Sequence, residues 1–354
     1  MLRGGPSGRP FPVYAVVRRS DSRMIHNRAM KRVQVLLWMA CFSLPLAGEV
    51  TAARDGDRID VSIAGAPFTS FHFGDTATKP YLHPLRASDG SVVTRGYPME
   101  EIPGEQRDHP HHRGAWFSHG DVNGIDFWAN EVSQRSRGRK GVIAFDEIVA
   151  VESGESEALI EADFAWNAPD GSRLLTERRV MRFGRSGDDN LVDFVIALTA
   201  EAGSVHFGDT KEGTFAVRLS TELEEPHWRA TGIPRTGRIV NAEGAWSEAN
   251  TWGKRSPWVD YSGSLQGKPV GVAILDHPGN PKHPTYWHVR GYGLFAANVF
   301  GEHDFHATES RDGGITIAKG ETLRFRYRIV IHPGRTADAE IGSKFEAWAQ
   351  AGGE

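Results

Sequence analysis

The sequence has almost no cysteine. Among its 354 residues Cys41 stands alone, inside an apolar stretch near the N-terminus. We therefore expect no disulfide, no thiolate metal ligand and no cysteine nucleophile in the rest of the chain. Three other signatures are missing: a glycine-rich phosphate loop after a strand, the G-x-S-x-G elbow and the H-E-x-x-H helix. Their absence argues against a P-loop nucleotide site, an elbow-type serine hydrolase and a zinc protease.

Long apolar runs are also scarce. The run Val33–Leu46 follows two basic residues and precedes small ones, which is typical of a secretory signal and too short for a membrane-spanning helix. We predict a signal peptide over residues 30–53, cleaved near Ala52 or Ala53, and a periplasmic or secreted protein. Residues 1–29 are basic and rich in Gly and Pro. We expect them to be an unstructured leader, or a mis-assigned one if translation starts at an internal methionine.

Positive charge is in deficit once the predicted signal is removed. Residues 1–53 hold eight of the 41 Lys and Arg and two of the 45 Asp and Glu, so residues 54–354 carry 33 basic against 43 acidic residues, a formal charge of −10. This balance argues against a nucleic-acid partner and against an anionic membrane surface. We also expect no membrane span after signal removal. Without disulfides, stability must come from a large core, which a chain of this length can supply.

The chain is rich in strand patterns instead. Segments of alternating polarity, about ten residues long, follow one another with only turn residues between them, as in antiparallel meanders. Residues 338–351 have helical spacing. We therefore predict one mainly β domain over residues 54–354, a large antiparallel β-sandwich with a C-terminal helix. The predicted strands are Asp57–Ile63, Phe68–Gly74, Gly141–Glu152, Glu157–Trp166, Arg173–Phe183, Asn190–Ala200 and Glu321–His332.

Irregular segments between these strands hold most of the His, Trp, Gly and Pro. Such loops carry function when a rigid scaffold holds them. The richest is DHPHHRGAWFSHGDVNGIDFW, residues 108–128. If its centre is extended, His119 and Asp121 share one face, so the carboxylate could set the tautomer of the imidazole. Pro110 breaks the extended pattern and predicts a turn for the histidines around it. For any one of these histidines, a structural hydrogen bond is the competing interpretation.

Two further segments could carry chemistry. In GDTKEG, residues 208–213, Glu212 could act as a general base beside Lys211, although a charged hairpin turn explains the motif equally well. In YWHVR, alternation places Tyr286, His288 and Arg290 on one strand face and Trp287 on the other.

Histidine, carboxylate and arginine with aromatic neighbours suit acid–base chemistry on a neutral, hydroxylated ligand, which suggests a sugar. The tryptophans Trp116, Trp128, Trp252, Trp258 and Trp287 could supply stacking faces. Expected acid–base or orienting groups are His109, His112, His119, Asp121, Glu212 and His288. Expected substrate-binding groups are Arg113, Trp116, Asn123, Trp128, Lys211, His277, His283, Trp287 and Arg290.

A metal site is the alternative. Several neutral histidines with a carboxylate can bind a divalent transition metal such as zinc, iron, nickel or copper. The spacings match no compact metal motif, so no cofactor is predicted. The alternative ligands are His109, His111, His112 and His119.

Several motifs together resemble the PmoA-like family of exported bacterial proteins, whose function is not established. They are YLHP (residues 81–84), TRGYP (94–98), the histidine segment, GDTKEG, WVDYSG (258–263), residues 276–301 and the closing FRYRIVIH. The resemblance implies a carbohydrate setting and a fold similar to the supersandwich of aldose mutarotases. It does not imply methane oxygenation, because that family's namesake subunit spans the membrane and this chain has no spanning helix beyond its signal.

The leading hypothesis is thus an exported carbohydrate-active enzyme that uses acid–base chemistry at or near an anomeric centre, as an epimerase, hydrolase or lyase. The alternatives are a metal-dependent enzyme and a non-catalytic glycan-binding protein. The leading hypothesis predicts that His109, His112, His119, His288 and Glu212 line one cleft.

Overall fold

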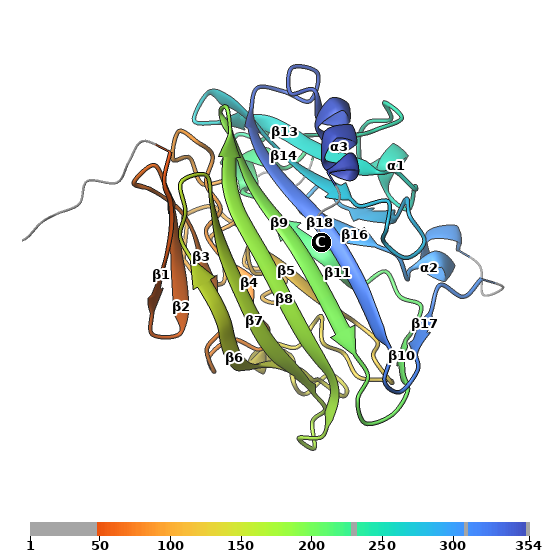
Figure 1. Ribbon diagram of the computed structural model, residues 1–354. Coiled ribbons are helices and arrows are strands. Elements are labelled where there is room, and N and C mark those ends of the chain that lie inside the picture. Colours follow the sequence, from red (N-terminus) through yellow and green to blue (C-terminus); the bar gives the residue numbers. More distant parts are fainter. Residues whose placement is uncertain (1–47, 228–231, 308–310, 352–354) are drawn as a thin grey trace, which may run out of the picture. The chain divides into compact units, whose positions relative to one another are not determined.

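The structure is a computed structural model that describes residues 48–227, 232–307 and 311–351. Two eight-stranded antiparallel sheets form the framework of the fold (Figure 1). Within the described ranges, no helix combines the length and apolar character needed to cross a membrane. The predicted leader and most of the predicted signal, residues 1–47, lie outside the described residues.

The first sheet, called the site sheet below, has the strand order β1-β2-β3-β4-β5-β11-β16-β15. It joins N-terminal strands to strands from the second half of the chain, through antiparallel pairing of β5 with β11. Its strands are β1 (Val50–Asp55), β2 (Arg58–Ile63), β3 (Ala66–His72), β4 (Tyr81–Leu82), β5 (Ala115–His119), β11 (Gly213–Arg218), β16 (Leu294–Asn298) and β15 (Tyr286–Val289).

The second sheet, called the meander sheet, has the order β12-β13-β14-β18-β9-β8-β7-β6. Its β6–β9 part is the antiparallel meander expected from the sequence, and each predicted strand end lies within about three residues of the observed one. Its strands are β12 (Arg238–Asn241), β13 (Trp258–Leu265), β14 (Lys268–Asp276), β18 (Thr322–Pro333), β9 (Asp189–Thr199), β8 (Arg173–Ser186), β7 (Glu157–Asn167) and β6 (Val142–Glu152).

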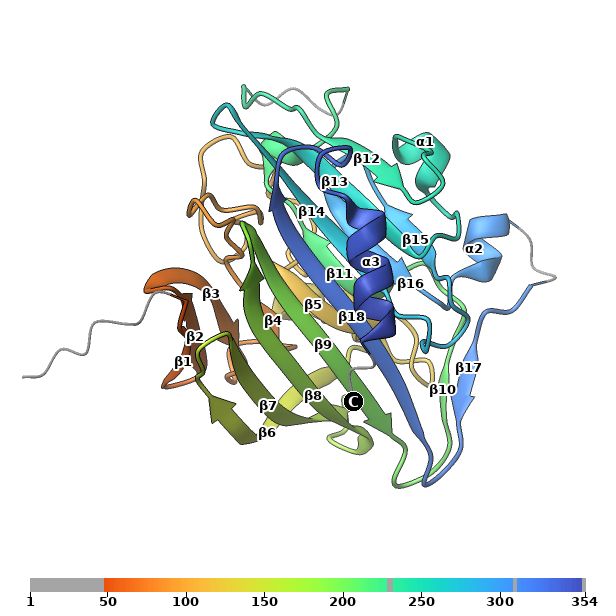
Figure 2. The ribbon, with the colours of Figure 1, turned by 45° about the horizontal axis from the view of Figure 1, so that its top comes forward.

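Short elements complete the fold. The C-terminal helix α3 lies against the outer face of the meander sheet, over β14 and β18 (Figures 1 and 2), where Phe345 and Trp348 pack on Leu275 and Val330. A β-sandwich with a C-terminal helix is therefore confirmed. The remaining elements are the β10–β17 ribbon (Val205–Phe207 with Ile315–Ile317), the 3-10 turns η1 (Val132–Gln134) and η2 (Thr221–Leu223), and the helices α1 (Glu248–Thr251), α2 (Glu302–His306) and α3 (Ile341–Gln350).

The core lies between the two sheets and is strongly aromatic. Phe117 of β5 lies 5.4 Å from Phe325 of β18, and Phe215 of β11 stacks at 4.6 Å on Tyr327, measured between ring centroids. Side chains on a strand alternate between faces, so the odd-numbered residues of β5 and β11 face this core. Their even-numbered neighbours, such as Trp116 and Arg218, therefore lie on the outer face of the site sheet.

One cross-strand row runs along that outer face. It begins at Arg58 on β2 and ends at His288 on β15, with each residue directly opposite the next. The row is Arg58, His72, Tyr81, Trp116, Ala216, Ala296 and His288. Seven neighbouring strands thus present one polar and aromatic line, and the two alanines near its end leave room for rings from the loops above.

The predicted C-terminal end of the signal peptide, residue 53, lies within strand β1. Val50 is 1% exposed, and its backbone exchanges two hydrogen bonds with Gly154. Cleavage near Ala53 would cut this strand and remove its buried residue. The cleavage site near Ala53 stays a prediction, and the fold adds one constraint to it: a boundary before Val50 would leave β1 whole. Export itself stays a prediction.

Candidate active site

The turn predicted around Pro110 stacks three rings above the outer face of the site sheet. The ring of His109 lies parallel to that of His112 at 4.7 Å and to that of Tyr292 at 5.4 Å. His112 in turn stacks on Trp116 at 5.3 Å. The backbone of His109 adopts a left-handed conformation, φ 46°, which costs free energy for a side chain of this kind. The surrounding contacts therefore hold His109 in place, stacked on both His112 and Tyr292, with its side chain 39% exposed.

A buried arginine pair anchors this turn through Asp108. Arg95 donates to Asp108 Oδ1 at 2.8 Å and to the His109 carbonyl at 3.0 Å, and Arg218 approaches the same carboxylate at 3.4 Å. Asp108 Oδ2 lies 3.2 Å from His109 Nδ1. Burial alone would raise the pKa of Asp108, but His109 and the two guanidinium groups hold it below its usual range. The carboxylate stays ionised and favours a proton on His109 Nδ1.

Two histidines of the turn are fixed as neutral donors. Arg218 lies 3.0 Å from His112 Nδ1, and because a guanidinium can only donate, this nitrogen must accept. Gln134 lies 3.0 Å from His111 Nδ1 and can donate in the same way. Burial lowers the pKa of His111 to about 2 and that of His112 well below 6.5. Both rings are therefore neutral and carry their proton on Nε2.

His288 on β15 shows the same arrangement. The indole of Trp252 donates to His288 Nδ1 at 3.1 Å. Burial, with smaller contributions from nearby cations, lowers the pKa of His288 to about 3. An indole N–H can only donate, so the ring is neutral with its proton on Nε2. His288 lies on the outer face, opposite Ala296, and Tyr286, two residues earlier on β15, shares that face as predicted.

Glu212 precedes β11 on the same face. Its backbone carbonyl accepts from the Gly120 amide at 2.7 Å, which ties it to the end of β5. Burial raises the pKa of the Glu212 carboxyl, while Lys211, with Nζ 3.8 Å from Oε1, lowers it in part. His109 also lowers the pKa of Glu212, and Lys211 and His109 both lower that of His288. These groups therefore lie within electrostatic reach of one another.

The structure thus brings part of the predicted set together. We call the assembled group the histidine cluster. Its members come from the 108–112 turn, the start and end of β11, and the β15–β16 hairpin. They are Asp108, His109, His111, His112, Lys211, Glu212, Arg218, His288, Arg290 and Tyr292.

His119 does not join the cluster, so the expectation of one shared cleft is wrong at this residue. Its ring is fully buried on the core side of the site sheet, between Phe207 and Phe300, and Nε2 hydrogen-bonds the Gly208 carbonyl at 2.8 Å. Burial lowers its pKa to about 4. His119 has the same parity along β5 as Phe117, and that parity faces the core.

Asp121 and Asn123 shape a turn. Asp121 Oδ1 accepts from the Gly124 amide at 2.8 Å, and Asn123 Oδ1 accepts from the His206 amide at 2.8 Å. Asn123 has a left-handed φ of 53°, a conformation that asparagine tolerates better than most residues. These contacts give both residues structural roles outside the cluster.

Three other predicted binding residues also lie elsewhere. His283 pairs with buried Asp276 at 2.7 Å and stacks on Phe345, and His277 lies edge-on to Trp348; both aromatic partners belong to α3 on the meander sheet. Trp287 is fully buried in the core and donates to the Ser256 carbonyl, as its parity opposite to His288 requires.

The other predicted binding groups lie at or beneath the cluster. Trp116 and Trp128 are fully buried under His112, so they support the histidine rings instead of offering a free stacking face. Arg113 makes a bidentate pair with Glu131, at 2.8 Å for both contacts. Arg290 pairs with Glu248 of α1 at 3.1 Å. Of the predicted cations, Lys211 and Arg290 belong to the cluster, and their side chains are partly exposed.

Sequence reasoning missed Arg218, Arg95 and Tyr292. Arg218 holds both Asp108 and His112, and its guanidinium lies 4.7 Å from the Tyr292 ring. The strand TFAVRLS did carry a signal for it: a charged residue in line with Thr214 and Ala216 must lie on the face away from the core. Arg95 and Tyr292 lie in loops, where no periodicity points to their partners.

The alternative metal ligands do not form one set. His119 is separated from the others by the sheet, and Nε2 of His111 and His112 carries the proton that a metal ligand would have to lose. Within the described residues, no group of three or more His, Cys, Asp or Glu has a metal-binding arrangement. The donor set therefore fits hydrogen bonding to a ligand better than coordination of a metal.

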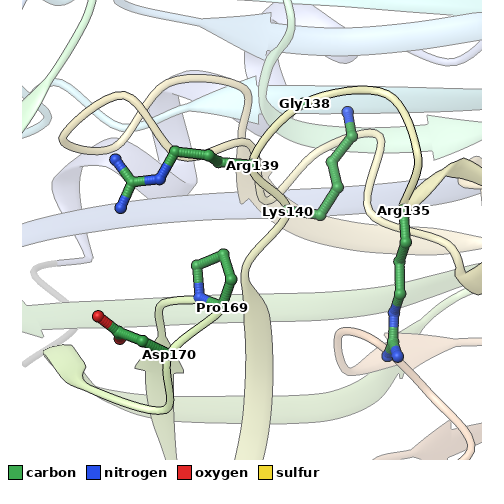
Figure 3. Close-up of a pocket in the computed structure, with 6 residues that line it drawn as sticks. All are labelled: Arg135, Gly138, Arg139, Lys140, Pro169 and Asp170. Atoms are coloured by element: carbon green, nitrogen blue, oxygen red, sulfur yellow. The ribbon is translucent and has the colours of Figure 1, made fainter.

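Two surface cavities lie near these elements. One is a pocket of about 380 Å³ where the loop before β6 meets the β7–β8 turn. Figure 3 shows its lining residues, Arg135, Gly138, Arg139, Lys140, Pro169 and Asp170. This pocket contains no member of the histidine cluster. A groove of about 610 Å³ lies on the outer face of the site sheet and includes Tyr81 and Arg113, which are neighbours of the cluster.

Fold and site together define a two-sheet antiparallel β-sandwich with a histidine-rich outer face. The chain belongs to the family described as "Family of unknown function (DUF6807)", whose sequence profile matches residues 58–346. That description does not mention PmoA, so the PmoA-like resemblance stays a prediction. No curated protein matches the chain.

Several solved structures are similar to the chain over most of its length. A galactose mutarotase-like protein from Lactobacillus casei is 9% identical with a TM-score of 0.38, covering 80% of this chain and 100% of its own. One from Clostridium acetobutylicum is 8% identical with a TM-score of 0.41, covering 80% and 98%. Galactose 1-epimerase from Lactobacillus acidophilus is 8% identical with a TM-score of 0.34, covering 81% and 98%.

Proposed function

We propose that the histidine cluster is the active site of a carbohydrate-active enzyme that interconverts the anomers of a reducing sugar. The observation that supports this most is the division of roles among the titratable groups. Glu212 has a pKa raised by burial, His109 has a carboxylate partner, and His112 and His288 are locked as neutral N–H donors. One base, one acid and two fixed donors meet the needs of proton transfer at a hydroxylated ring.

In the proposed reaction, ionised Glu212 takes the proton of the anomeric hydroxyl. Protonated His109 gives its Nε2 proton to the ring oxygen. The bond between the anomeric carbon and the ring oxygen breaks, and its electron pair stays on the oxygen as the new hydroxyl forms. The former anomeric oxygen becomes the carbonyl oxygen of the open sugar. Rotation about the adjacent carbon–carbon bond and reversal of both proton transfers close the ring as the other anomer.

The carboxylates favour this reaction over glycoside cleavage. A glycosidase of the common type needs two available carboxyl groups across the scissile bond. In the cluster, Asp108 is bound by Arg95 and Arg218, and neighbouring Glu248 is bound by Arg290. Glu212, whose Oε1 lies 3.8 Å from Lys211 Nζ and which makes no arginine pair among the described residues, is the carboxylate best placed to exchange a proton.

The test is polarimetry of freshly dissolved α-D-glucose, α-D-galactose and α-D-mannose, with protein at catalytic amounts. We expect the intact protein to accelerate anomer interconversion of at least one sugar. Glu212→Gln and His109→Asn should each lower kcat/KM by about 10²–10⁴-fold, the usual worth of a general acid or base.

The matched controls are Glu346→Gln on the exposed face of α3 and His206→Gln on β10, which change the same residue types away from the cluster. Both should keep full activity. If the intact protein accelerates none of the three sugars, the proposed function is wrong. If it does so and Glu212→Gln retains full activity, the site assignment is wrong.

A further inference from the structure

The groove beside the cluster has the properties of a binding site in its own right. Its volume of about 610 Å³ falls in the range of small-molecule sites. It is lined by β2, β3, β4 and the 98–100 loop. The residues that line it are Arg58, Asp60, Ser70, His72, Thr76, Tyr81, His83, Pro84, Pro98, Met99, Glu100 and Arg113.

A buried polar group in this lining lacks a partner among the described residues. His83 is 3% exposed, and its Nε2 makes no hydrogen bond; the nearest carboxylate oxygen, on Glu100, is 3.7 Å away. The Thr94 hydroxyl accepts from the Leu85 amide and meets His83 Nδ1 at 3.5 Å. Burial lowers the pKa of His83 to about 3. The ring is therefore neutral, and its geometry leaves an N–H on Nε2 that a ligand acceptor can satisfy.

The groove has no net charge. Its cations, Arg58 and Arg113, are matched by Asp60 and Glu100. Asp60 is already bound by Arg58 and by the Ser70 hydroxyl. Both histidines of the lining have lowered pKa values, caused chiefly by burial. A polar lining whose positive and negative charges cancel suits a neutral ligand with hydroxyl groups, and it disfavours a strongly anionic one.

The groove and the cluster share one face of one sheet. His72 and Tyr81 of the groove are followed directly in the cross-strand row by Trp116, which supports His112. With neighbouring strands about 4.8 Å apart, His72 lies about 10 Å from Trp116 and about 24 Å from His288 along the row. A single sugar ring cannot reach from the groove to Glu212 and His288, but a short chain of linked sugars can.

We propose that this groove is a second subsite that holds a neutral sugar unit of an oligosaccharide whose reducing end lies at the histidine cluster. This inference rests on the proposed function and narrows its substrate class from free monosaccharides to short neutral oligosaccharides. His83 Nε2 donates to a sugar oxygen, and Glu100 accepts from a sugar hydroxyl.

The test compares chain lengths. Anomer interconversion is measured for glucose, galactose and mannose and for the di-, tri- and tetrasaccharides built from each, with Kd from calorimetry. We expect kcat/KM to rise by about tenfold or more from the monosaccharide to the trisaccharide, mainly through a lower KM. Thr76→Trp places a large ring in the groove from an exposed position. This variant should abolish the rise in kcat/KM with chain length and leave kcat/KM for the monosaccharide unchanged.

Thr322→Trp changes another exposed threonine, on the meander sheet; it is the matched control and should keep the rise in kcat/KM with chain length. If the monosaccharide reacts but kcat/KM does not rise from the monosaccharide to the longer sugars, the subsite is overturned and the proposed function stands. The subsite is also overturned if kcat/KM still rises with chain length in Thr76→Trp. Failure of every sugar to react or bind overturns the proposed function and the subsite together.

Discussion

At the scale of single residues, the hydrogen-bond partner of each ring nitrogen decides what a histidine can do. His112 and His288 receive donors on Nδ1 from groups that can never accept, so they present Nε2–H and resist protonation. His109 has a carboxylate at Nδ1 and an exposed ring. Neighbouring histidines in one short motif therefore differ in chemistry because their partners differ.

Glu212 gives a prediction for the pH dependence of activity. Burial raises the pKa of this carboxyl above its ordinary value of 4.5, and Lys211 opposes the rise. As a base it works when ionised, so kcat/KM should fall as pH decreases through the raised pKa. Lys211→Gln removes the opposing charge, raises the pKa further and should move the acid limb of the profile to higher pH.

The measurement is a pH–rate profile of kcat/KM for the intact protein and for Lys211→Gln, at low ionic strength, where the charge effect is largest. Lys268→Gln changes an exposed lysine that pairs with Asp89 and should leave the profile in place. An acid limb that stays fixed, or moves to lower pH, in Lys211→Gln would rule out Glu212 as the base.

At the scale of elements, alternation along the strands was predictable from sequence, and the orientation of each strand was not. The pattern GAWFSHG correctly groups Phe117 with His119, and YWHVR correctly separates His288 from Trp287. Which group faces the core depends on pairing with β11 and β16, strands far away in the chain. For this reason the sequence analysis assigned His119 to the site, whereas the structure buries it in the core on the other face of the sheet.

A second element-scale feature is the ion pair that crosses the meander sheet. His332 on β18 lies 3.0 Å from Asp260 on β13, across Gly271 of β14. A Cβ at Gly271 would lie 2.3 Å from the His332 ring, so only glycine permits this crossing. Burial alone would lower the pKa of His332, but Asp260 and the Pro333 carbonyl at Nδ1 raise it, because both ring nitrogens meet acceptors.

This pair predicts how stability varies with pH. Because the folded pKa of His332 lies above the unfolded value of about 6.5, the pair stabilises the fold fully below that value and loses its effect as pH rises through the folded pKa. Asp260→Asn leaves a buried group without its partner and should lower the free energy of unfolding at pH 6 by roughly 3–5 kcal/mol. The difference from the intact protein should shrink at high pH.

Urea unfolding at pH 6 and pH 9 measures both effects. Asp55→Asn, which breaks an exposed pair with Arg58, is the matched control and should cost at most about 1 kcal/mol. A variant at Asp260 that is as stable as the intact protein at pH 6, or equally destabilised at both pH values, would contradict the assignment of a charged pair.

At the scale of the whole molecule, the sandwich was predictable because long alternating strands with tight turns have few other solutions. The site was only partly predictable. The turn at residues 108–112, Glu212 and His288 were found from their side-chain types. Arg95, Arg218 and Tyr292 complete the site through contacts between loops and strands that no local pattern records.

The N-terminal edge of the fold provides a last prediction. β1 pairs with β2 over six residues, and Val50 links it by two backbone hydrogen bonds, 2.8 and 3.0 Å, to Gly154 in the turn between β6 and β7. A chain that starts at Arg54 loses four of the six pairs and both links. Loss of the buried Val50 side chain alone should cost about 1.5–3 kcal/mol. For a domain of this size, each lost kcal/mol lowers Tm by roughly 2–4 °C.

Thermal unfolding of chains that start at Gly48 and at Arg54 measures the effect. A chain that starts at Gly48 and carries Val50→Ala keeps the backbone links and should melt between the two. Equal Tm values for the two starts would show that β1 contributes no stability, and a mature end near Ala53 would then be compatible with the fold. A lower Tm for the Arg54 start would show that β1 stabilises the fold and would argue against a mature end near Ala53, because this strand closes the edge of the site sheet.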